Sequence, residues 1–165
     1  MPFPLNYEGA GKSGPEGQDY IRILNNTGGT ILNGAVYMKA YLTTIADTTN
    51  PIISVVPVAV ATVADAACQM LVIDDPTGSI LNGAYGRACI KGYTIALVDG
   101  TTDVTAGDGI SVLNAGTAFV FSEAGSSGAT GALLTITSAV VLETYTTNSA
   151  ALKKICLLGR QVTVA

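Results

Sequence analysis

Short runs rich in Val, Ile, Thr and Tyr follow one another from Tyr20 onward, and clusters of Gly, Asn, Asp and Pro separate them. β-branched and aromatic residues favour extended backbone, and the separating residues are those that tight turns require. No long window keeps the period of about 3.6 residues that an amphipathic helix needs. The sequence therefore predicts an all-β fold, a compact β-barrel or β-sandwich of short strands.

Nine segments have the composition of strands, and we expect them at residues 19–25, 35–43, 53–61, 68–73, 84–97, 109–113, 118–122, 133–143 and 155–164. Residues 149–158 have a second interpretation, as one short helix that leads into the last strand. The Gly-rich stretch 123–132 and the stretch 99–109, with its two Asp-Gly pairs, are expected to be loops.

The N-terminal segment differs in composition from the rest of the chain. Residues 1–18 contain three prolines and four glycines, a density that prevents a regular helix or a central strand. We expect them to form an extended N-terminal arm, followed by a single β domain over residues 19–165. Phe3, Leu5 and Tyr7 would anchor the arm on another surface; the alternative is a disordered terminus.

Composition limits the classes of partner. Charged residues make up only 12% of the chain and apolar residues 48%, so much of the apolar surface is expected to lie against other protein. The most apolar stretch, 52–64, is shorter than the roughly 20 residues that span a bilayer, and the N-terminus lacks the pattern of a secretory signal. With a net charge of -4 and scattered basic residues, neither a membrane nor a nucleic acid is an expected partner.

Groups that could carry chemistry have simpler structural interpretations. The chain contains no His, the usual general base and the commonest metal ligand. The GAGKSG segment at 9–14 does not complete a phosphate-binding loop, because the position that requires Gly is Asn6. Asp74 and Asp75 are consecutive and precede Pro-Thr-Gly, where an Asp commonly initiates a turn. We expect no catalytic activity and no cofactor.

The remaining acidic residues and the cysteines favour structural roles as well. A calcium site around Asp99, Asp103 and Asp108 is the alternative to ordinary turn chemistry, and we expect no metal. The cysteines are an odd number, widely spaced and set among apolar neighbours, so buried free thiols are expected rather than disulfides or metal ligands. They are Cys68, Cys89 and Cys156.

The pentapeptide ILNGA occurs twice, at 31–35 and at 80–84. Asn-Gly favours a tight turn because both residues tolerate positive φ, and it is a strong signal for a hairpin. Outside the pentapeptide the copies diverge quickly, VYMKAYLTT against YGRACIKGY. We interpret ILNGA as the same turn at two strand entrances, beginning at Ala35 and Ala84, rather than as a binding motif or a duplicated domain.

Three stretches follow one another in a specific order: ILNNTGGTILNGAVY, ISVVPVAVATVADAACQMLVIDD and LNGAYGRACIKGYTIALVDGTTDVTAGDGISVLNAG. The last contains Gly83, then Gly86 to Gly92, and then the turn Ala106-Gly107-Asp108. From residue 20 to residue 116 this order resembles the capsid decoration, or cement, proteins of tailed bacteriophages.

The resemblance implies a structural virion protein on the outer surface of the phage head, made in the cytoplasm of the bacterial host. It implies a homotrimer that binds the phage major capsid protein and reinforces contacts between its subunits without catalysis. Phe3, Leu5, Tyr7 and Tyr20 are then candidate capsid or subunit contacts. The alternative is a head-fibre or adhesin-type domain that binds host surface glycans, for which the absence of Trp is unfavourable.

Overall fold

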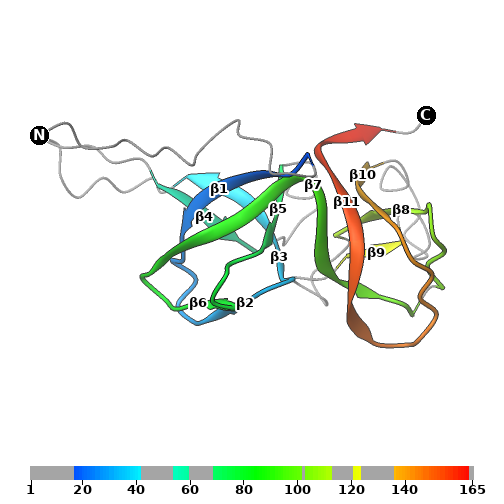
Figure 1. Cartoon of the computed structure of the whole chain (residues 1–165), viewed down its shortest axis with the longest axis horizontal. Helices are drawn as coiled ribbons and strands as arrows, with labels where there is room; N and C mark the ends of the chain where they lie inside the picture. Colours follow the sequence, from blue (N-terminus) through cyan, green and yellow to red (C-terminus); the bar gives the residue numbers. More distant parts are fainter. Residues whose placement is uncertain are drawn as a thin grey trace, which may run out of the picture.

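The computed structural model describes residues 17–41, 54–59, 69–101, 103–112, 121–123 and 136–163. These ranges contain strands and turns, which confirms the all-β prediction (Figure 1). Within them there is no helix, and so none that could cross a membrane. The expected arm lies outside the described residues, except for Gly17 and Gln18.

The described strands are β1 (Asp19–Leu24), β2 (Ile31–Leu32), β3 (Val36–Tyr41), β4 (Val55–Val58), β5 (Met70–Ile73), β6 (Ser79–Ile80), β7 (Tyr85–Asp99), β8 (Gly109–Ser111), β9 (Ser122–Glu123), β10 (Ile136–Val141) and β11 (Ala150–Thr163). Each expected strand overlaps one of them. The short strands β2 and β6 were not predicted.

The helical interpretation of residues 149–158 is wrong. β11 begins at Ala150, and its residues pair with β7 without interruption, from Ala150 opposite Asp99 to Leu157 opposite Gly92. A long antiparallel partner satisfies the backbone groups of this segment, so tertiary context outweighs a local preference for helix. The expected loop at 99–109 is confirmed for the described residues between Asp99, where β7 ends, and Gly109, where β8 begins. In the other expected loop, 123–132, Glu123 belongs to β9 instead, and residues 124–132 lie outside the described ranges.

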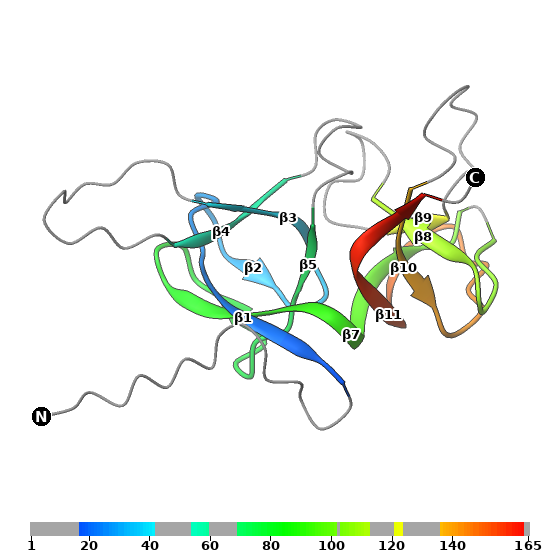
Figure 2. The same cartoon turned by 90° about the horizontal axis from the view of Figure 1, so that it is seen from above.

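Strand β7 connects the two halves of the molecule. In the described part of the chain the sheet order is β4-β3-β5-β7-β11-β10-β8-β9, and β1 pairs separately with β7. The first part of β7 pairs with β1 and β5, and the second part pairs with β11. Figures 1 and 2 show the resulting curled antiparallel sheet, with β1 to β6 around one end of β7 and β8 to β11 around the other.

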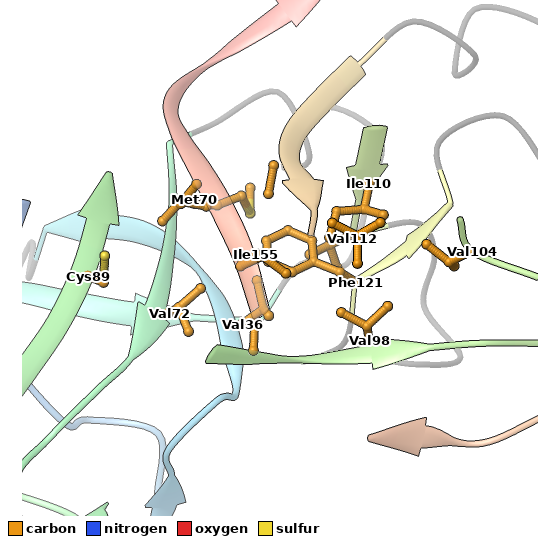
Figure 3. Close-up of a cluster of buried hydrophobic side chains, with 14 residues drawn as sticks. Val36, Met70, Val72, Cys89, Val98, Val104, Ile110, Val112, Phe121 and Ile155 are labelled. Atoms are coloured by element: carbon orange, nitrogen blue, oxygen red, sulfur yellow. The ribbon is translucent and has the colours of Figure 1, made fainter. Parts of the chain in front are cut away.

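Both halves contribute to the hydrophobic core. One cluster fills the first half and comprises Ile21, Ile23, Ile31, Ala35, Tyr37, Leu71, Ile73, Ile80 and Ala88. The other cluster spans both halves. Val36 of β3 and Val72 of β5 project from the sheet face that points away from the first cluster, and they pack in one cluster with Phe121 and Ile155 of the second half (Figure 3). Alternate residues of β3 and β5 therefore enter different clusters, as the two-residue period of a strand requires.

β7 bends between the two halves (Figure 1), and Gly92 is the residue at which its pairing passes from β1 to β11. Gly92 has φ +92, and a Cβ there would lie 2.5 Å from the carbonyl oxygen of Gly17 and 2.9 Å from Cα of Gln18. The Gln18 side-chain amide donates a hydrogen bond to the Tyr93 carbonyl. We call Gly17 and Gln18 the arm root, since residues 1–16 precede them; this root is packed on the bend.

Candidate interaction surfaces

Tyr20 is the one predicted contact residue that lies in the described ranges; Phe3, Leu5 and Tyr7 lie outside them. The Tyr20 hydroxyl is 2.9 Å from Gln18 Oε1 and 2.9 Å from Asp74 Oδ2, and the Arg87 guanidinium lies 4.2 Å from the centre of its ring. The ring also packs against the core cluster that spans both halves. Tyr20 thus fixes the start of β1 to the rest of the protein.

The two consecutive carboxylates beside Tyr20 have separate structural roles. Arg87 Nε donates to the carbonyl of Asp74 at 2.8 Å, and its guanidinium lies 3.7 Å from the Asp74 carboxylate. Asp75 Oδ1 accepts hydrogen bonds from the backbone N–H and the hydroxyl of Thr77, which confirms the predicted turn. Burial alone would raise the pKa of Asp75, but the hydrogen bonds from Thr77 and Arg87 outweigh it and lower that pKa.

Burial changes the acidity of two further groups in this region. It raises the pKa of Tyr20 to about 12, with a contribution from the hydrogen bond to Asp74. It also raises the pKa of the Cys89 thiol to about 11. Cys89 and Cys156 are free thiols as predicted, although Cys156 is only partly buried, and Cys68 lies outside the described residues. The Cys89 thiol is therefore expected to be protonated near neutral pH.

The loop acids also serve turns. Asp99 Oδ1 accepts hydrogen bonds from the N–H and hydroxyl of Thr101, and Asp108 Oδ2 accepts one from the N–H of Thr105. Within the described ranges, no group of three or more His, Cys, Asp or Glu side chains is arranged to hold a metal ion. The arrangement of these acids is that of ordinary turns, which was one of the two interpretations of this segment.

Three apolar side chains form an exposed patch where β7 and β11 pair. Tyr93 and Ile95 of β7 and Leu152 of β11 are 50%, 52% and 54% exposed, and we call them the outer strip. Leu152 pairs with Leu97, the next outward residue of β7. The same face carries an exposed charge, Lys154 opposite Ile95, while Thr94 and Ala96, which alternate with the strip on β7, are buried. A solvated face of an antiparallel sheet is normally polar.

A groove of about 350 Å³ runs beside the outer strip, between the two halves. Its lining comprises Gln18, Asn33, Gly34, Ile73, Asp74, Thr94, Ile95 and Leu152. The halves are joined along it, since Leu97 donates a backbone hydrogen bond to the Gly34 carbonyl at 2.8 Å. Leu152 packs so closely on Gly34 that a Cβ there would overlap its side chain.

The two ILNGA copies lie against each other. Strands β2 and β6 pair with Ile31 opposite Ile80, and both isoleucines are buried. The following leucines, Leu32 and Leu81, are 63% and 64% exposed, and we call this pair the ILNGA corner. In an antiparallel pair such diagonal neighbours are about 7–8 Å apart. The corner is a second exposed apolar group that sequence analysis missed.

The predicted tight turns are confirmed, but they do not form hairpins. Ala35 donates its N–H to the Leu32 carbonyl at 3.3 Å, and Ala84 donates to Leu81 at 3.0 Å. In each turn the glycine has positive φ and the asparagine does not, so the turn is not of the hairpin type that requires positive φ at both central residues. Each turn instead carries the chain from the β2–β6 pair into the main sheet.

Asn25 joins the two copies through its side chain. It is fully buried, and its Nδ2 donates to the carbonyls of Gly29 and Ile80 at 2.8 Å each. Its Oδ1 accepts from the N–H of Thr27, as Asp75 does from Thr77 before the second copy. The signal for this network is visible in the sequence, because Asn-x-Thr-Gly and Asp-x-Thr-Gly precede the two pentapeptides at similar distances.

Comparison of the sequence with protein-family models finds no matching family. No curated protein matches the sequence either. Function is therefore inferred from the residues of this chain and from the surfaces they form.

Proposed function

We propose that this protein is a capsid decoration protein of a tailed bacteriophage. It binds the outer surface of the head as a homotrimer and reinforces contacts between subunits of the major capsid protein. The observation that supports this proposal best is the pair of exposed apolar groups on one all-β body, the outer strip and the ILNGA corner. A protein that links several neighbours needs more than one such contact.

The physical basis is the burial of exposed apolar surface. Full burial of a Leu or Ile side chain stabilises by about 1.5–3 kcal/mol, so the half that remains exposed here is worth about 1 kcal/mol per residue. One such contact is weak, but several within a trimer add through effective concentration. Because binding favours the assembled shell over free subunits, it stabilises the shell by mass action.

The polar residues support a binding role rather than catalysis. The Asp74 carboxylate accepts a hydrogen bond from Tyr20, and the Asp75 carboxylate accepts hydrogen bonds from Thr77 and Arg87. The chain also has no His to act as a general base. In the proposed complex Phe3, Leu5 and Tyr7 of the arm contact either the capsid or a second subunit of the trimer. Tyr20 positions the start of β1 through its internal hydrogen bonds.

The proposal is tested by mixing purified protein with phage heads that lack it and imaging them by electron cryomicroscopy. We expect density at regular lattice positions and a higher temperature of head disruption. The double variant Leu32→Asp, Leu81→Asp should reduce occupancy. The matched control Leu142→Asp should not, since Leu142 is also exposed but belongs to neither apolar group.

Absence of lattice density with the unmodified protein would refute a role on the head. Binding to host cells but not to heads would favour the glycan-binding head-fibre or adhesin function instead. Equal occupancy for Leu32→Asp, Leu81→Asp and for the control would show that the ILNGA corner does not contact the capsid.

A further inference from the structure

The N-terminal segment enters the described structure beside the outer strip. The arm root packs on Gly92, one residue before Tyr93, and the Gln18 side chain bonds to the Tyr93 carbonyl. Gln18 lines the same groove as Ile95 and Leu152. Residues 1–16, which lie outside the described ranges, therefore join the described structure at the edge of an exposed apolar surface.

The residue pattern of this segment matches that surface. Phe3, Leu5 and Tyr7 alternate with Pro4 and Asn6, so on an extended chain all three project from one face. Their spacing is then about 6.6 Å, twice the rise of one residue in a strand. Tyr93 and Ile95 project from β7 with the same two-residue period. An extended segment can thus place one apolar side chain beside each member of the outer strip.

Charge supports the same pairing. Lys154 lies opposite Ile95 on β11 and is exposed, and Lys91 is an exposed residue of β7 two positions before Tyr93. The N-terminal segment carries Glu8 directly after its apolar residues and a second acid, Glu16, against one lysine. Glu8 is the acid that adjoins the apolar residues, so its attraction to a lysine beside the strip would favour one register of the segment.

The length of the spacer indicates which strip is occupied. Residues 8–16 separate Tyr7 from the arm root and include three glycines. As a flexible chain they span about 15–18 Å, and fully extended about 30 Å. The strip of the same chain begins next to the root, so such a spacer is not needed to reach it. It suits the strip of a neighbouring molecule.

We propose that residues 1–7 of one copy bind the outer strip of a second copy. Each copy donates one segment and receives one, which is a head-to-tail contact; such a contact forms a ring when the rotation between copies closes, as a trimer requires. This inference rests on the homotrimer of the proposed function and names the contact between its copies, and its test requires no phage head.

The test uses two variants with complementary defects. The first lacks residues 1–16 and keeps the strip; the second carries Ile95→Lys and Leu152→Lys and keeps the segment. Size-exclusion chromatography with light scattering should show a multimer for the full chain, whose single-chain mass is 16.7 kDa, and the mass of one chain for each variant alone, which is lower for the truncated variant. An equimolar mixture of the variants should form a complex, because the segment of the second fits the strip of the first. The control Leu142→Lys should keep the mass of the full chain.

Each other outcome overturns the proposal. A truncated chain that retains the full multimer mass would show that the segment does not join the copies. The full chain could instead be monomeric at every concentration, and truncation could make the backbone amides of β7 and β11 exchange hydrogen faster. That pair of results would show that the segment binds the strip of its own chain. Failure of the mixture to associate, with both variants unfolding at the same urea concentration as the full chain, would show that segment and strip do not bind each other.

Discussion

Replacing Gly92 with alanine is expected to destabilise the protein and to loosen the arm root. The residue sits at the bend where β7 passes from one half of the sheet to the other, with φ +92. The new Cβ would lie 2.5 Å from the Gly17 carbonyl oxygen and 2.9 Å from Cα of Gln18. Both neighbours are backbone atoms, so a side-chain rotation cannot relieve the overlap.

The magnitude follows from two contributions that a matched variant separates. A left-handed backbone costs an L-residue about 1–2 kcal/mol relative to Gly, and overpacking against fixed atoms adds about 1–3 kcal/mol. Gly92→Ala should therefore lower the free energy of unfolding by about 2–5 kcal/mol. Gly83→Ala should show the first contribution alone, because Gly83 has φ +77 and no atom within 4 Å of an added Cβ.

Urea unfolding followed by circular dichroism measures both losses, and limited proteolysis of the folded protein reports on the root. Cleavage near Gly17 should become faster in Gly92→Ala and stay unchanged in Gly83→Ala. Equal losses of stability in the two variants, or an unchanged cleavage rate in Gly92→Ala, would refute the idea that the bend of β7 holds the arm root.

Three further outcomes are expected. Asn25→Ala should lower the free energy of unfolding by about 1–3 kcal/mol, because it leaves the Ile80 carbonyl without its hydrogen-bond donor. The control Asn26→Ala changes an exposed neighbour and should alter the free energy of unfolding by less than about 0.5 kcal/mol. Similar losses in the two variants would contradict a structural role for the Asn25 hydrogen bonds. In an alkaline titration of tyrosinate absorbance, Tyr20→Phe should remove a component near its pKa of about 12. Because the folded pKa lies above the unfolded value of 10.0, the stability that Tyr20 contributes is present below pH 10 and is lost as the pH rises toward 12; a titration curve unchanged by the substitution would count against this environment. In a Cys68→Ser background, timed alkylation with peptide mapping should label Cys156 before Cys89, because the Cys89 thiol is buried and has a pKa of about 11. Labelling of both thiols at the same rate would contradict the burial of Cys89.

Turns were predicted correctly where a few adjacent residues decide the structure. The Asp75-x-Thr77 turn and the two Asn-Gly turns were predicted because their hydrogen bonds close within a few residues. The interaction surfaces were not predicted. Whether Ile95 or Leu152 is exposed depends on which elements cover each face of β7 and β11, and those elements come from distant parts of the chain.

The sequence by itself determined the all-β class, the approximate positions of the strands, the free thiols Cys89 and Cys156, and the turns at both ILNGA copies. These properties depend on side-chain type and on residues that are near neighbours. Only the tertiary structure decided that residues 150–158 extend as β11, that the two ILNGA copies pair with each other, and that an apolar strip adjoins the arm root. Each of these depends on backbone hydrogen bonds and packing between segments far apart in sequence, and a local pattern does not specify such partners.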